Sequence, residues 1–91
     1  MKKVIYKYQL KKLGTSEVRI PVHAEILSVA SQYGQVVMFA LVSEDGNTPT
    51  EVKHFESVYT GQSVDADISN FKFLGTVMFD DGTLVSHIFE Y

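Results

Sequence analysis

Residues 78–85 read MFDDGTLV. An Asp-Gly pair between two apolar stretches is a strong hairpin signal, because both residues accept the positive φ angles of a type I′ turn. Asp81-Gly82 therefore predicts a hairpin between a strand over residues 71–79 and a strand over 83–90. The Gln-Tyr-Gly sequence at 32–34 predicts a second tight connection, between strands over 25–31 and 35–43.

Turn-forming residues punctuate the rest of the chain at similar intervals, and the segments between them are rich in Val, Ile, Phe, Tyr and Thr. No window shows the i, i+3, i+4, i+7 apolar pattern of a helix. The remaining strands are predicted over 3–10, 17–20 and 51–59, with at most one helical turn over 64–69. We predict an all-β fold: a small antiparallel β-sandwich or open barrel of about seven strands.

The composition bounds the organisation of the chain. Its 91 residues fit one domain, so we expect a single β domain over residues 1–91, and the 45% hydrophobic content is far above that of a disordered chain. There is no cysteine, which excludes disulfides and thiolate metal sites and fits a reducing cytosol. No apolar run approaches the ~18 residues of a membrane span, so we expect a cytoplasmic protein with no membrane partner.

Charge argues against duplex DNA as a partner. The formal net charge is −3, and five of the eight cationic residues precede residue 13. Duplex binding needs many phosphate-neutralising cations spread over one face. We interpret the lysines near the start as protection of an edge strand; the alternative is electrostatic attraction of a small anion or an acidic protein patch.

Alternation predicts which faces are buried. In the strand over 3–10, Val4, Tyr6, Tyr8 and Leu10 share one face, which we expect to contact the core. The segment VVMFALV at 36–42 is apolar on both faces, as in a central strand or one whose second face contacts another subunit. We therefore expect a homo-oligomer, a dimer or tetramer.

No catalytic pattern is present. The chain lacks the common nucleophile, zinc and phosphate-loop motifs, and its only neutral-pH bases are His23, His54 and His87. We interpret His87, which shares a face with Val85 and Phe89, as a packing residue. Asp65 and Asp67, like Asp80 and Asp81, lack the pattern of a calcium loop and are interpreted as solvated turn residues. We expect no enzyme, no cofactor and no metal.

Recognition chemistry concentrates at residues 59–63. Tyr59 offers a ring for stacking, Thr60 and Ser63 offer hydroxyls, and Gln62 adds an amide. Gly61 lets a ligand approach the backbone closely. These groups are suited to holding a nucleobase or a phosphate; the alternative interpretation is an ordinary turn with a packed tyrosine.

The chain resembles a family of small uncharacterised proteins encoded by tailed bacteriophages. The resemblance rests on IYKYQL at 5–10, Pro21 followed by AEILSV at 24–29, the turn at 32–34, ALV at 40–42, Thr60-Gly61, FLGT at 73–76 and LVSHIFE at 84–90. Members often carry Gly at position 23, Trp at position 39 and His-Pro after the Thr-Gly pair, where this chain has His23, Phe39 and Gln62-Ser63.

That family in turn looks similar to anti-CBASS sponges, which are oligomers that sequester cyclic dinucleotide immune signals such as 3′3′-cGAMP without cleaving them. The resemblance implies pockets at subunit interfaces in the host cytosol. Stacking on the bases would come from Tyr59, with Tyr8 or Tyr33. Hydrogen bonds would come from residues 60–63, and phosphate contacts from Arg19 or Lys53.

Two alternatives remain open. The first is a protein-interaction or structural β-module that binds a host protein, which would equally use the apolar segment at 36–42. The second is a single-strand nucleic-acid binder that uses the lysine-rich, tyrosine-bearing first strand as a stacking platform.

Overall fold

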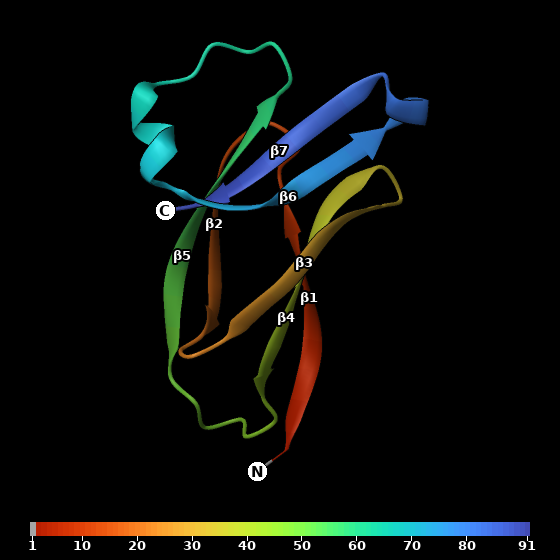
Figure 1. The fold of residues 1–91 in the computed structure, drawn as a ribbon. Coiled ribbons are helices and arrows are strands. Elements are labelled where there is room, and N and C mark those ends of the chain that lie inside the picture. The colour runs from red at the N-terminus through yellow and green to blue at the C-terminus, as the bar shows by residue number, and fades with distance from the viewer. Residues whose placement is uncertain (1) are drawn as a thin grey trace.

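The computed structural model describes residues 2–91, which form seven strands and two short 3₁₀ turns (Figure 1). In chain order these are β1 (Lys3–Leu10), β2 (Gly14–Pro21), β3 (Glu25–Gln32), β4 (Gln35–Ser43), β5 (Thr50–Tyr59), η1 (Ala66–Asn70), β6 (Lys72–Phe79), η2 (Asp80–Gly82) and β7 (Leu84–Glu90). The predicted all-β class with seven strands is confirmed.

The strands form two antiparallel sheets that pack face to face. A three-stranded sheet has the order β1-β4-β3, and a four-stranded sheet has the order β2-β5-β7-β6. The body measures 43 × 29 × 15 Å (Figure 1). Along one side β3 packs closely on β6 at Gly75, where an added Cβ would lie 2.8 Å from Cγ2 of Val29.

Both predicted hairpins are present. Asp81 has φ 56° and ψ 30°, Gly82 has φ 89°, and the Thr83 N–H donates to the Asp80 carbonyl at 3.1 Å, as in a type I′ turn. Gln32 pairs with Gln35, and the two residues between them, Tyr33 and Gly34, have φ angles of 53° and 73°. The positive φ angles match the twist of the flanking strands.

Two elements differ from the sequence prediction by more than one residue at an end, and the other strands by one residue at most. β2 begins at Gly14 rather than at residue 17, because Gly14 itself makes the bend at φ 94° and Thr15 and Ser16 already pair with β5. The helical turn spans Ala66–Asn70 rather than 64–69. Both differences lie at element ends, where local sequence signals are weakest.

The core lies between the sheets, and β4 contributes most to it. Its alternate residues face the other sheet and are buried: Val36, Met38, Ala40 and Val42. The other core residues are Leu10, Ile20, Phe55, Val77, Phe79 and Ile88. β4 is therefore the central strand of its sheet, as predicted, and its remaining side chains point away from the core.

The alternation predicted for β1 holds with one exception. Leu10 is buried, and Val4 and Tyr8 pack partly buried against the core. Tyr6, on the same face, stays 50% exposed on β1, which is an edge strand of its sheet.

Candidate functional site

After β5 the chain folds back over the outer face of the four-stranded sheet, and the start of this loop is tightly fixed (Figure 1). Gly61, at φ 87°, makes the bend. The Gln62 N–H donates to the Tyr59 carbonyl at 3.1 Å, and Gln62 Oε1 accepts from the Tyr59 N–H at 2.9 Å. The Thr60 N–H donates to the Val85 carbonyl on β7 at 3.2 Å.

The far end of the loop is fixed by η1 and by an aromatic stack. Asp65 Oδ1 caps η1 by accepting from the Asp67 N–H at 3.0 Å. The Phe71 ring stacks on Tyr91, with centroids 4.5 Å apart and an interplanar angle of 15°. The Tyr91 N–H donates to the His54 carbonyl at 3.0 Å, which joins this stack to β5.

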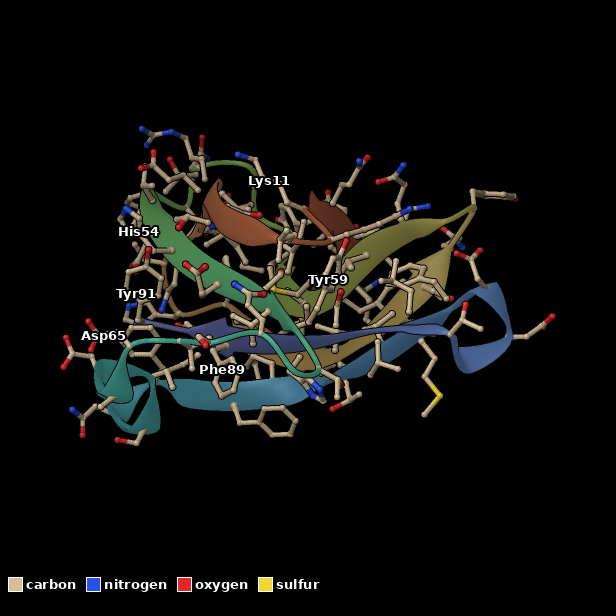
Figure 2. All side chains as sticks on the ribbon, turned by 90° about the horizontal axis from the view of Figure 1, so that it is seen from above. Lys11, His54, Tyr59, Asp65, Phe89 and Tyr91 are labelled. Carbon is tan, nitrogen blue, oxygen red and sulfur yellow. The ribbon has the colours of Figure 1, made fainter. Side chains whose placement is uncertain are left out.

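Between this loop and the sheet lies a cavity of about 400 Å³, here called the loop cavity. Glu56 and Val58 of β5 form its floor. Figure 2 shows Asp65 and Tyr91 on the same side of the molecule, with His54 beside Tyr91. The lining residues are Glu56, Val58, Gln62, Ser63, Val64, Asp65, Asp67, Ile68, Phe71 and Tyr91.

The loop cavity is acidic. Its lining contains the carboxylates of Glu56, Asp65 and Asp67 and no lysine or arginine among the described residues. Glu56 Oε1 accepts from the Thr15 hydroxyl at 2.7 Å, which holds that carboxylate in place. Carboxylates beside an aromatic wall can bind a cation or a group rich in N–H donors, and they repel phosphate.

The predicted recognition residues at 59–63 divide between two faces of β5. Gln62 and Ser63 line the loop cavity. Tyr59 lies on the same side of β5 as Phe55 and Ser57, which face the sandwich interior, and in Figure 2 it points away from Phe89. Gly61 supplies the bend, and Thr60 bonds to His87.

The predicted phosphate ligands lie at the other end of β5. Lys53 Nζ is 3.2 Å from Glu90 Oε2 and 3.6 Å from Glu51 Oε1. The hydrogen bond to Glu90 raises the pKa of Lys53, with burial opposing it. Arg19 Nη1 donates to the Thr50 hydroxyl at 3.2 Å. Along β5, Lys53 lies six residues from Tyr59, or roughly 20 Å, so neither cation lies beside residues 59–63.

Tyr8 and Tyr33 also lie outside the loop cavity. Tyr8 is partly buried on the inner face of the three-stranded sheet, where burial and the neighbouring Tyr6 raise the pKa of its hydroxyl. Tyr33 is 94% exposed at the tip of the β3–β4 hairpin. One subunit therefore does not bring the three predicted stacking tyrosines together.

The aromatic wall of the loop cavity was not anticipated from the sequence. Phe71 and Tyr91 meet only because η1 returns the chain to the end of β7, which depends on long-range register. Asp65 and Asp67, interpreted above as solvated turn residues, line the cavity while remaining exposed. The sequence did carry one relevant signal: Asp65 directly precedes residues 66–70, and an aspartate in that position is typical of a helix N-cap.

His87 does share the outer face with Val85 and Phe89, but both its ring nitrogens are hydrogen-bonded. Nε2 is 2.7 Å from the Thr60 hydroxyl, and Nδ1 is 3.0 Å from the Thr76 hydroxyl. Over residues 2–91 no group of three or more metal-binding side chains is found. In the same range no helix is long and apolar enough to span a membrane.

Comparison with known proteins gives one match. No curated protein and no solved structure matches the chain. The family described as a domain of unknown function, DUF7352, matches residues 1–91, which is the whole chain given. The protein therefore belongs to the DUF7352 family.

Proposed function

We propose that the protein is an interaction module that binds a partner protein by taking an arginine or lysine side chain of that partner into the loop cavity. One observation carries this proposal: three carboxylates and the stacked Phe71–Tyr91 pair surround a space of about 400 Å³ with no lysine or arginine in its lining.

The chemistry of a basic side chain matches this lining. A guanidinium donates paired hydrogen bonds to a carboxylate and stacks on aromatic rings, and its aliphatic stem packs on apolar groups. Glu56 and Asp67 would accept the hydrogen bonds, Tyr91 would offer its ring, and Val58 and Ile68 would contact the stem.

A blocked single residue tests this proposal directly. Acetyl-arginine-amide and acetyl-citrulline-amide are each titrated into the protein, and the amide NMR shifts of the protein are recorded. The citrulline compound has the same shape without the charge. We expect millimolar binding of the arginine compound, with shifts at Glu56, Asp67 and Tyr91. Glu56→Gln and Asp67→Asn should each weaken it about 3- to 10-fold. Equal responses to the two compounds, or shifts elsewhere, would contradict the proposal.

A second candidate is sequestration of a cyclic dinucleotide, the function that the sequence resemblance implies. The observation that favours it is the near-parallel Phe71–Tyr91 stack, because an aromatic wall can hold a nucleobase at about 1–3 kcal/mol per base. The guanine edge, N1–H and N2–H₂, is a double donor suited to Glu56 or Asp67. The phosphates would then lie outside the cavity, against cations from another subunit.

This sponge function includes oligomerisation, a bacteriophage origin and action in the host cytosol as parts of the proposal. Melting temperatures with 3′3′-cGAMP, cyclic di-AMP and guanosine separate it from the first candidate. Stabilisation by the two guanine compounds but not by cyclic di-AMP, with nucleotide recovered intact after heating, supports sequestration. No shift with any of them excludes it, and recovery of a cleaved product indicates an enzyme.

A further inference from the structure

The outer face of the three-stranded sheet, here called the β4 face, is apolar along its centre and polar at both edges. Val37, Phe39 and Leu41 point outward from β4. Pairing register places Ile5 of β1 beside Leu41, and Ala30 of β3 beside Val37. Ile5 is 56% exposed, whereas Val37 is buried, and the Lys7 side chain reaches across β4 to donate to Gln32 Oε1 on β3.

The two edges carry opposite charge. On β1, Lys3 pairs with Ser43 and Lys7 with Phe39, so both lysines flank the row of Ile5 and Leu41. On β3, Glu25 pairs with Leu41 and occupies that same row. Glu25 therefore lies on the opposite edge of the sheet, at a position along the strands that falls between those of Lys3 and Lys7.

We propose that a second copy of this chain docks on the β4 face, related by a twofold axis that runs parallel to β4. Such an axis places β1 of one copy over β3 of the other without shifting the rows. Glu25 of the second copy then lies between Lys3 and Lys7, where it would replace Gln32 Oε1 as the acceptor for Lys7, and the same contact recurs by symmetry. An axis perpendicular to the strands would set lysines against lysines.

The central residues fit this arrangement because they lie on the axis. Phe39 of one copy meets Phe39 of the other, and Leu41 likewise meets its symmetry mate. Phe39 and Leu41 are part-exposed and Val37 is buried, so the apolar surface open to another flat sheet centres on Phe39 and Leu41.

The size of the face predicts the strength of the dimer. Three strands about 4.8 Å apart and eight residues long have a footprint of roughly 15 by 26 Å. This is small beside the ~800 Å² of accessible surface per partner in stable complexes. We expect a dimer with a micromolar dissociation constant that weakens as salt screens the lysine–glutamate contacts.

Sedimentation velocity over about 5–500 μM protein tests the interface through charge reversal. Glu25→Lys should raise the dissociation constant at least 10-fold, and Phe39→Asp should abolish the dimer. The triple variant Lys3→Glu, Lys7→Glu and Glu25→Lys should restore association. Glu17→Lys, which makes the same charge change on the outer face of the other sheet, should leave it unchanged.

Two results would overturn the proposed dimer, and a third would assign the β4 face to a different partner. Circular dichroism melts establish that each variant is folded before it is scored. A wild-type protein that stays monomeric at 500 μM overturns the proposal, as does a triple variant no better than Glu25→Lys. Binding of a single-stranded oligonucleotide that Phe39→Asp removes, with no dimer present, would assign the face to nucleic acid instead.

Discussion

The Thr60 hydroxyl lies 2.7 Å from Nε2 of His87, whose Nδ1 lies 3.0 Å from the Thr76 hydroxyl. One imidazole therefore connects the residue that follows β5 to β7 and β6. A neutral ring donates at one nitrogen and accepts at the other, so both hydroxyls find a partner of the right kind. This contact fixes the first residue of the loop that covers the cavity.

Replacing Thr60 by Val should destabilise the protein through this contact. Because the bond is exposed, we expect a loss of only about 0.5–1 kcal/mol in the free energy of unfolding, measured by urea titration. Thr60→Ser keeps the hydroxyl and is the matched control. If the Val and Ser variants unfold at the same urea concentration, the contact contributes nothing.

Two fully buried serines should respond to alanine substitution with opposite sign. The Ser57 hydroxyl has no hydrogen-bond partner among the described residues, whereas Ser86 Oγ donates to the Lys12 carbonyl at 2.7 Å. Ser57→Ala should be neutral or stabilise by up to about 1 kcal/mol, and Ser86→Ala should cost about 1–2 kcal/mol. Thermal melts of both variants give the comparison; a large loss in Ser57→Ala would reveal a partner for that hydroxyl.

Gly75 should not tolerate alanine. An added Cβ would lie 2.8 Å from Cγ2 of Val29, so the Val29 side chain or the strands β3 and β6 would have to shift, at a cost of about 1–3 kcal/mol. Gly46, where an added Cβ meets nothing within 4 Å, serves as the control for alanine itself. In the double variant with Val29→Ala, part of the loss should be recovered. Equal melting temperatures for the Gly75 and Gly46 variants would show that the sheets yield there.

Tyr91→Ala should loosen the loop without unfolding the sandwich. Removing the ring that stacks on Phe71 should lower the free energy of local opening of the loop by about 0.5–1.5 kcal/mol. This corresponds to roughly 2- to 10-fold faster hydrogen exchange at the Ile68 and Phe71 amides. Tyr91→Phe keeps the stack and should exchange like the wild type. Acceleration spread over the core strands as well would mean that the stack stabilises the whole fold.

The Lys53–Glu90 pair predicts a loss of stability at alkaline pH. Its hydrogen bond raises the pKa of Lys53 above the ordinary 10.5, so the stabilisation is present below that value and is lost as pH rises through the folded-state pKa. At pH 7, Lys53→Met should cost about 0.5–1 kcal/mol, and this difference from wild type should shrink above pH 10.5. The raised pKa of Tyr8 acts in the same direction and is left unchanged by the substitution, so wild type and variant share it. If the difference in stability between wild type and Lys53→Met stays constant through the alkaline range, the Lys53–Glu90 pair is not its cause.

Local patterns predicted the fold well, because both hairpins are encoded by adjacent residues. Asp81-Gly82 and Tyr33-Gly34 need no partner elsewhere to adopt positive φ angles. The apolar alternation of residues 36–42 likewise identified a central strand without knowledge of its neighbours. Strand order came only from the structure, since it depends on which edges meet across the sandwich.

The site was harder to predict because it depends on which face of a strand each side chain occupies and on how strands distant in sequence pair. Tyr59 was grouped with Gln62 and Ser63 by proximity in sequence, although it shares the face of the buried Phe55 four residues earlier. Lys53 was treated as a free cation, and only the register of β5 with β7 places it beside Glu90.

The thinness of the body, 15 Å, has a consequence for how strongly such a module can act. The loop cavity lies on the outer face of one sheet and the β4 face on the outer face of the other. A pair of copies joined through the β4 face would hold its two cavities on opposite outer sides, so it could crosslink two molecules of its target. Against a target that is itself multivalent, avidity could multiply a weak single-site affinity by about 10²- to 10⁴-fold without any new contact.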